Sequence, residues 1–299
     1  MDIETALTLK IGQSKNPIIT TYEVGLHLFQ LYQDKKYNGQ EITSVRKALP
    51  ERRDYQRHLN KLLERGILQE SKSVSNHNVF AIFGKDQSSS EDIACSIDPF
   101  AYLSHLSAME WHGLTDRLPK LMFLSTPPTK EWKEFAYKRM QRDLGAALPD
   151  YLERGLPPLL RYNFDRVNRN VVKRRSSIHL GAFINIRDRA LRVSTIGRTF
   201  LDMIDSPDLC GGIYHVLDVY ERHAEEYLDL IVSEIDRHGR KIDKVRAGYI
   251  LDERLGLSHP VLESWSQAVQ RGGSQKLDAS RDYSPRYSEK WCLSLNVEA

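Results

Sequence analysis

The sequence has few of the features that mark membrane, secreted or zinc-binding proteins. It contains three cysteines, Cys95, Cys210 and Cys292, whose wide spacing fits neither a zinc site nor an even set of disulfides. A reducing compartment, the cytoplasm, is therefore expected. Mean hydropathy is −0.49 and no run of about 18 apolar residues occurs, so no membrane-spanning helix is expected. The first four residues, Met-Asp-Ile-Glu, lack the basic region and apolar core of a secretory signal.

An excess of one charge is also lacking overall, because 43 Lys and Arg are nearly balanced by 40 Asp and Glu. The charge is nevertheless sorted along the chain. Residues 35–65 carry nine basic and four acidic residues, and residues 161–198 carry ten basic and two acidic residues. Residues 218–240 are acidic instead, with three basic and seven acidic residues. Two basic segments are therefore predicted to be able to meet polyanions, although net charge alone does not indicate a nucleic-acid binder.

A chain of 299 residues, 40% of them hydrophobic, is long enough for two folded domains. Residues 84–92, Gly-Lys-Asp-Gln-Ser-Ser-Ser-Glu-Asp, are polar, rich in serine and without an apolar anchor, which is typical of a linker. We therefore predict an N-terminal domain over residues 1–85, a linker over 86–92 and a C-terminal domain over 93–299.

The order of elements in the N-terminal domain indicates a winged helix-turn-helix. Thr20 and Glu23 have the spacing of a capping box ahead of a first helix. The next predicted element is a short helix over 43–49, which Thr43 or Ser44 can cap. A third helix over 52–65 and two strands over 67–69 and 79–83, with a polar loop between them, are predicted to follow. Helix, short helix, helix and hairpin is the order of this DNA-binding fold.

The third predicted helix presents a polar and basic face opposite an apolar stripe. The stripe is formed by Tyr55, Leu59, Leu62 and Leu63. The residues predicted to bind DNA, on this helix, just before it and at the loop tip, are Arg46, Lys47, Arg52, Arg53, Gln56, Arg57, Asn60, Lys61, Lys72, Asn76 and His77. Arginine reads guanine, and Gln or Asn reads adenine, in the major groove. The alternative interpretation is a solvated helix face.

The C-terminal domain is predicted to combine a small sheet with a helical back half. Asp98-Pro99 is expected to begin a helix that ends at Gly113. Strands are predicted over 121–124, 159–164, 178–186, 189–193 and 290–297, and helices over 195–204, 212–223, 224–238, 245–255 and 260–270. The predicted fold class is therefore α+β, a winged helix-turn-helix followed by a larger mixed α/β domain.

A second basic surface is predicted within residues 161–198. Its members are Arg161, Arg166, Arg169, Lys173, Arg174 and Arg175. Three interpretations stay open: a solvated face balanced by the acidic helix around Glu221 to Asp236, a contact with DNA phosphates, or a surface for RNA or an acidic protein.

Signatures of an enzyme or a metal site are weak. Gly211-Gly212 and Gly272-Gly273 lack the context of a phosphate-binding loop. His105 and His112 are seven residues apart on one predicted helix, but no third metal ligand is evident. We expect no catalytic residue, no metal and no cofactor.

The carboxylates do not form a nuclease signature, since no Asp…Glu-x-Lys string occurs. Asp202 and Asp252-Glu253 are interpreted as surface acids of helices and as partners for Arg198 or Arg246. A nucleic-acid-processing enzyme with a nuclease-like C-terminal domain, tethered by a winged helix, is the alternative function.

Four segments, in order, resemble motifs of the AbiEi family. Residues Tyr102–Leu114 are similar to the family's helix with serine, two residues, serine-alanine, then histidine-glycine-leucine. Thr195–Ile204 is similar to its threonine, arginine-threonine, leucine-aspartate helix, and Gly211-Gly212 and Arg246–Glu253 resemble later landmarks. The resemblance covers nearly the whole chain, winged helix included.

The resemblance implies a bacterial type IV antitoxin of an abortive-infection system that also represses its own operon. Its N-terminal domain would bind operator DNA, expected as inverted repeats upstream of the operon. Its C-terminal domain would carry the antitoxin activity against a nucleotidyltransferase-like toxin encoded beside it. No catalysis and no membrane partner are implied.

Overall fold

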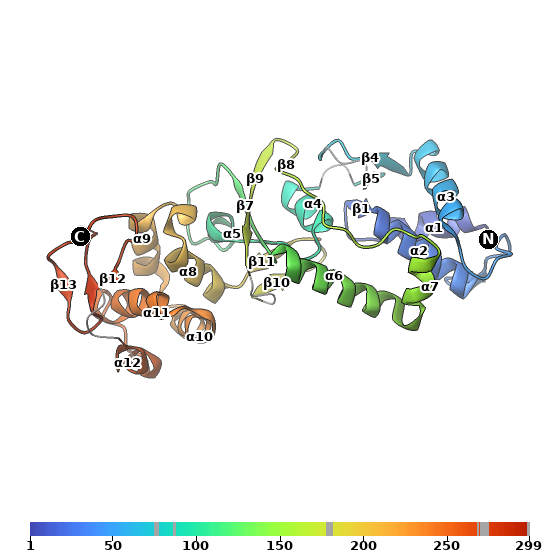
Figure 1. Cartoon of the computed structure of the whole chain (residues 1–299). Helices are drawn as coiled ribbons and strands as arrows, with labels where there is room; N and C mark the ends of the chain where they lie inside the picture. Colours follow the sequence, from blue (N-terminus) through green and yellow to red (C-terminus); the bar gives the residue numbers. More distant parts are fainter. Residues whose placement is uncertain (75–77, 86–87, 178–181, 268, 270–274, 298–299) are drawn as a thin grey trace. The chain divides into compact units, whose positions relative to one another are not determined.

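The chain is a mixed α+β protein, shown as a cartoon in Figure 1. The computed structural model describes residues 1–74, 78–85, 88–177, 182–267, 269 and 275–297. Up to residue 126 its elements are α1 (Ile3–Gly12), β1 (Ile18–Thr20), α2 (Thr21–Asp34), β2 (Lys36–Tyr37), β3 (Gln40–Glu41), α3 (Arg52–Glu64), β4 (Leu68–Glu70), β5 (Val79–Ile82), α4 (Ser90–Ile97), β6 (Tyr102–Leu103), α5 (His105–Trp111) and β7 (Met122–Thr126).

The later elements are α6 (Thr129–Leu144), η1 (Gly145–Ala147), α7 (Leu148–Glu153), β8 (Arg166–Val167), β9 (Asn170–Ser176), β10 (Phe183–Asn185), β11 (Arg192–Ser194), α8 (Ile196–Asp205), η2 (Pro207–Cys210), α9 (Ile213–His223), α10 (Leu228–His238), α11 (Lys241–Gly248), the π-helical turn η3 (Tyr249–Arg254), α12 (Pro260–Gln267), β12 (Gln275–Lys276), β13 (Tyr287–Ser288) and β14 (Leu293–Ser294). None of the helices in the described part of the chain is long and apolar enough to cross a membrane.

The strands are mostly short and pair in both directions. The strand orders are β1-β5-β4, β10-β11-β6-β7-β9-β8, β12-β14-β13 and β2-β3. Strand β5 is antiparallel to both of its neighbours, and Ile18 of β1 lies opposite Ala81. Strands β6 and β11 are parallel, with Leu103 opposite Val193.

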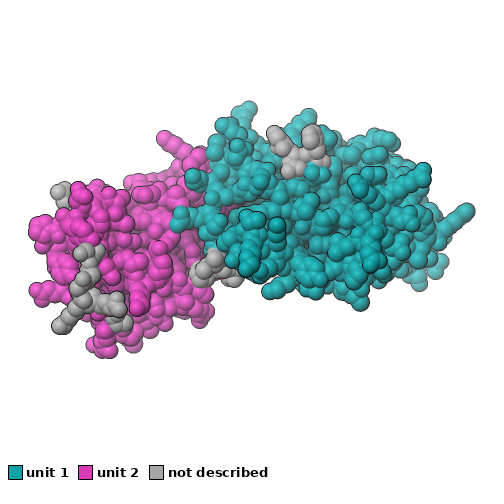
Figure 2. Space-filling model, viewed as in Figure 1, with its two compact units in different colours: residues 1–102, 125–178, 185–192 teal, residues 103–124, 179–184, 193–299 magenta. Residues whose placement is uncertain are grey.

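The chain divides into two compact units, coloured separately in Figure 2. Unit 1 comprises residues 1–102, 125–178 and 185–192, and unit 2 comprises residues 103–124, 179–184 and 193–299. This division differs from the predicted one at residues 86–92. The difference arises because residues 125–178, far along the sequence, pack with the N-terminal segment.

The end of the predicted linker is the start of a helix. The Ser89 hydroxyl accepts a hydrogen bond from the backbone N–H of Asp92 at 3.2 Å and so caps α4. The Asp92 carboxylate is paired with Arg189 at 2.7 Å. Serine and aspartate favour helix N-termini as well as linkers, so composition alone did not separate the two.

Three helices and the β1-β5-β4 sheet form the N-terminal part of unit 1. The predicted capping box of α2 is confirmed, since the Glu23 carboxylate accepts the Thr20 N–H at 2.9 Å and the Thr20 hydroxyl accepts the Glu23 N–H at 3.4 Å. Helix α1 and strand β1 were not predicted. Helix α1 packs against α2 and α3, with Leu7 and Ile11 fully buried.

The predicted short helix over residues 43–49 is wrong. These residues form turns and bends without helix, after the β2–β3 hairpin. The Ser44 hydroxyl, expected as a helix cap, instead accepts the backbone N–H of Ile3 at 3.0 Å. The segment is therefore tied to the start of α1.

The predicted helix from Asp98 to Gly113 is also wrong. Asp98 ends α4, and its buried carboxylate accepts hydrogen bonds from Thr126 at 2.7 Å and the Trp132 ring at 2.9 Å. Strand β6 and helix α5 lie within residues 99–113. The strand predicted over residues 159–164 is wrong as well, because these residues form no strand. Helix α6, which was not predicted, buries Trp132 and two further side chains spaced four residues apart.

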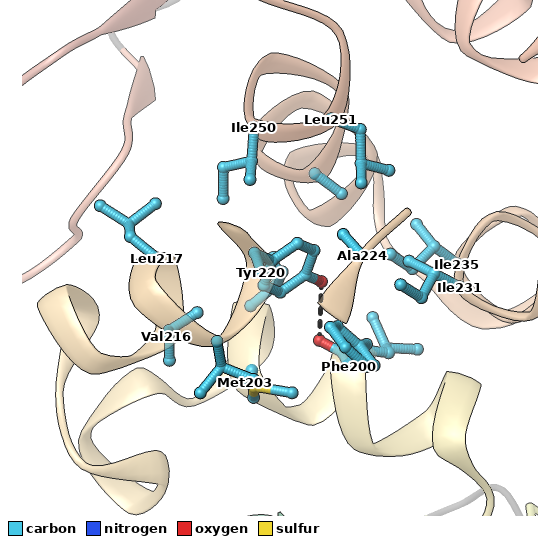
Figure 3. Close-up of a cluster of buried hydrophobic side chains, with 14 of the residues drawn as sticks. Phe200, Met203, Val216, Leu217, Tyr220, Ala224, Ile231, Ile235, Ile250 and Leu251 are labelled. Atoms are coloured by element: carbon cyan, nitrogen blue, oxygen red, sulfur yellow. Dashed lines mark hydrogen bonds between the residues drawn. The ribbon is translucent and has the colours of Figure 1, made fainter. Parts of the chain in front are cut away.

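The helical back half lies in unit 2, and Figure 3 shows part of its cluster of buried hydrophobic side chains. The predicted helices over 195–204, 212–223 and 224–238 correspond to α8, α9 and α10, whereas 245–255 is divided between α11 and η3. Thr195 caps α8 through the N–H of Arg198. The rings of Phe200 and Tyr220 meet edge to face at 4.9 Å, and the Tyr220 hydroxyl donates to the Phe200 carbonyl at 2.9 Å.

Unit 1 is expected to lose stability in acid because of His27 on α2. Burial first, and then the positive charge of Lys10, lower the pKa of the His27 ring from 6.5 to about 4. Between these values the unfolded chain binds the extra proton, so stability falls as the pH drops from 6.5 to 4. The loss corresponds to about 3 kcal/mol of unfolding free energy. Urea unfolding at pH 7 and pH 4 should show a smaller loss in His27→Gln, and an equal loss in both proteins would contradict this assignment.

Candidate nucleic-acid interface

Helix α3 presents the polar face that its sequence predicts. The exposed side chains on this face are Arg52, Arg53, Gln56, Arg57 and Asn60. Tyr55 and Leu62 are buried on the other side, and Leu59 and Leu63 are half-buried. The amphipathic arrangement is therefore confirmed, while contact with DNA stays a prediction.

Buried Asp54 organises one edge of this face. Its carboxylate accepts hydrogen bonds from Lys47 at 2.8 Å and from Arg57 at 3.3 Å. Burial raises the pKa of the Asp54 carboxyl group, but the hydrogen bonds from Lys47 and the Glu51 N–H outweigh it and lower the pKa. Lys47 and Arg57 are thereby held together, whereas neighbouring Arg46 is exposed in the irregular segment.

A groove of about 440 Å³ borders the other edge of the face. It lies between α3 and residues 155–160, and Arg52 and Gln56 line it, whereas Arg53 does not. The backbone N–H of Arg52 donates to the Arg154 carbonyl at 3.1 Å. No sequence pattern indicated this neighbour, because residues 155–160 belong to the segment predicted as a separate domain.

Lys61 and His58 connect α3 to the rest of unit 1. Lys61 is half-buried and forms an ion pair with Glu4 of α1, so much of its charge is already matched. His58 is 2% exposed, and its ring shares a hydrogen bond with the Tyr32 hydroxyl at 3.2 Å. Burial lowers the pKa of His58, which favours its neutral form.

The predicted wing loop lies beside a turn from the second basic segment. Lys72 is exposed just after β4, while Asn76 and His77 lie outside the described residues. The backbone N–H of Asn168, in the β8–β9 turn, donates to the Ser73 carbonyl at 2.9 Å. The turn and the loop are therefore adjacent, which no sequence pattern indicated.

The second basic set does not form a single surface. Arg166, Arg169, Lys173 and Arg175 are exposed on the β8–β9 hairpin. Arg161 and Arg174 are half-buried instead, and Arg174 lies over the Phe164 ring at 5.1 Å. The β8–β9 turn thus places Arg166 and Arg169 near the β4–β5 loop. Arg161 and Arg174 instead line a cavity beside α6.

His105 of α5 and His112 at its end both form hydrogen bonds within the protein. The His105 ring bonds to the Ser104 hydroxyl at 2.8 Å, and the His112 ring bonds to the Ser194 carbonyl at 2.7 Å. Within the described residues, no group of three or more His, Cys, Asp or Glu side chains is arranged to hold a metal ion.

Two interpretations of the charged residues in unit 2 need correction. Asp202 pairs with Arg198 at 2.8 Å as predicted, but it is 1% exposed and not a surface acid. Asp252 pairs with Lys290 at 2.6 Å, whereas Arg246 donates to the Lys276 carbonyl at 3.0 Å. Asp252 and Arg246 therefore bond to residues other than those that the sequence suggested.

Comparisons with known proteins leave the family open. No family model matches the chain, and no curated protein matches it. A solved structure that is similar to this chain is the crystal structure of RV2827C protein from Mycobacterium tuberculosis, with 11% sequence identity and a TM-score of 0.46. The alignment covers 97% of this chain and 89% of that chain, and a likeness of this degree carries no argument about function.

Proposed function

We propose that the chain is a DNA-binding transcriptional regulator whose α3 enters the major groove. The observation that carries this proposal is the exposed Arg53, Arg57 and Asn60 face, because these side chains match the donors and acceptors of base edges. The order α1-β1-α2-β2-β3-α3-β4-β5 and the β1-β5-β4 sheet support a winged-helix interpretation of this part. A departure from that fold is the long connection of residues 35–51 between α2 and α3.

The β8–β9 hairpin is proposed to extend the interface. Its exposed Arg166 and Arg169 lie beside the β4–β5 loop, where a wing would meet the phosphate backbone. This favours the DNA interpretation of the second basic segment over a merely solvated face for these two arginines.

The direct test is an electrophoretic mobility shift with the DNA upstream of the chain's own gene. We expect a shifted complex that survives an excess of random DNA of the same length. Equal competition by random and upstream DNA would leave non-specific binding only, and no complex with either would refute the proposal.

The hairpin is expected to contribute to the salt dependence of binding. Each phosphate contact contributes a slope of about −0.9 to the logarithm of affinity against the logarithm of salt. Arg166→Ala/Arg169→Ala should therefore reduce the slope by up to about 2. The matched control is Lys138→Ala/Arg142→Ala, two exposed basic residues on α6 of the same unit. An equal change of slope in both double variants would show that the hairpin makes no specific contact with DNA.

The antitoxin role is proposed on the AbiEi resemblance alone. Its test is growth rescue of cells that express the neighbouring toxin gene from an independent promoter. A variant that no longer binds DNA should still rescue growth, because repression cannot reach that promoter. Loss of rescue in a folded variant of this kind would contradict an antitoxin activity that is separate from DNA binding.

A further inference from the structure

Unit 1 contains an open cavity of about 790 Å³ beside α6. Its lining residues come from α6, residues 152–163 and β9. The volume falls within the roughly 300–1,000 Å³ of small-molecule sites in proteins. The lining includes Lys133, Arg161 and Arg174 but no Asp or Glu, so its charge is positive throughout.

The two arginines of the cavity are incompletely matched by the protein. Arg161 donates to the Thr129 hydroxyl at 3.2 Å, but its buried Nε has no hydrogen-bond partner among the described residues. Arg174 donates long hydrogen bonds to neutral groups, at 3.4 Å to the Tyr162 carbonyl and 3.3 Å to the Asn163 side chain, and it lies over the Phe164 ring. Within the described residues, neither guanidinium forms an ion pair with a carboxylate.

The electrostatic cost of this arrangement is visible on Arg174. Burial first, and the positive charge of Arg161 second, lower the pKa of the Arg174 guanidinium. Two like charges that line one cavity are stabilised by an anion bound between them.

Beside the polar Thr129, Asn163 and Ser176, much of the remaining lining is apolar or aromatic. Trp132 lies in its buried wall at 2% exposure. Tyr137, Leu152 and Leu160 line it while 54%, 41% and 48% exposed, so three large side chains with accessible apolar surface gather at one cavity. A bound ring would cover them and be drawn out of water at the same time.

We propose that this cavity is a binding site for a small aromatic anion, in which a planar ring carries a carboxylate or phosphate group. The anionic group is held by Arg161 and Arg174, and the ring packs against Tyr137 and the apolar rim. This site is independent of the proposed DNA-binding role.

Isothermal titration calorimetry on the full chain tests the proposal with stated probes. The aromatic anions are 4-hydroxybenzoate and adenosine 5′-monophosphate, and the partial probes are inorganic phosphate and benzyl alcohol. We expect at least one aromatic anion to bind about 10-fold or more tightly than either partial probe, because charge and ring act together. A preference for one of the two aromatic anions identifies the anionic group as carboxylate or phosphate. Binding of neither aromatic anion above the level of the partial probes would overturn the site.

Variants separate this cavity from general charge attraction. Arg161→Gln and Tyr137→Ala should each lower the affinity for the more tightly bound aromatic anion by about 10-fold. The matched control is Lys173→Gln, which removes an exposed charge next to Arg174 that does not line the cavity. Unfolding midpoints without ligand show whether each variant is folded, and Tyr137 is exposed enough for its removal to be tolerated. An equal loss in Lys173→Gln, or no loss in either cavity variant, would refute the assignment.

Discussion

Replacing Asp202 with alanine is expected to lower the free energy of unfolding of unit 2 by about 3–5 kcal/mol. Asp202 is 1% exposed and accepts a hydrogen bond from Arg198 Nε at 2.8 Å, with Arg198 itself 9% exposed. Removal of the carboxylate takes the Asp202 ion pair away from a buried guanidinium, which costs more than the pair contributes.

The exposed pair Asp218–Arg222 on α9 is the matched control for this experiment. It has the same four-residue spacing, but its side chains are 58% and 46% exposed. Asp218→Ala should therefore cost less than about 1 kcal/mol. Urea unfolding followed by circular dichroism measures both variants, and a similar cost for the two would show that burial of the Arg198 pair is energetically unimportant.

The Arg198 pair also bears on the AbiEi-like segment Thr195–Ile204. Thr199 and Asp202 of this segment are buried, and the Thr199 hydroxyl bonds to the Thr195 carbonyl at 2.9 Å. These residues therefore act in the packing of α8. A double replacement, Arg198→Met/Asp202→Leu, should be far less destabilising than Asp202→Ala, since it leaves no buried charge.

The second large effect is expected at the DNA interface, where Arg53→Ala should weaken binding to upstream DNA by about 1–3 kcal/mol. Arg53 is exposed on α3, lies outside the groove along residues 155–160 and belongs to the polar face that is proposed to meet bases. Its removal should leave stability nearly unchanged, because surface substitutions of this kind usually change it by less than about 0.5 kcal/mol.

A mobility-shift titration with upstream and random DNA distinguishes the kinds of contact. Loss confined to upstream DNA indicates a base contact, and an even loss indicates a phosphate contact. Lys36→Ala is the control, since Lys36 is 63% exposed in the same unit but lies on the β2–β3 hairpin. Unchanged affinity of Arg53→Ala for both DNAs, or an equal loss in Lys36→Ala, would argue against α3 as the reading helix.

Local patterns were enough to predict several elements of this protein. The capping box at Thr20 and Glu23, the amphipathic face of α3 and the Thr195 cap of α8 depend on residues within a few positions of one another. Such short-range signals survive in the fold because the tertiary contacts agree with them.

The tertiary structure alone decided which segments belong together and where polar groups find partners. Ser44 was expected to cap its own helix but bonds to α1, and Asp98 was expected to begin a helix but bonds to Thr126 and Trp132. The pairing of the β8–β9 turn with the β4–β5 loop likewise joins residues far apart in sequence. A buried or half-buried polar group must satisfy its hydrogen bonds with whatever the fold places nearby, and that neighbour cannot be found from local sequence.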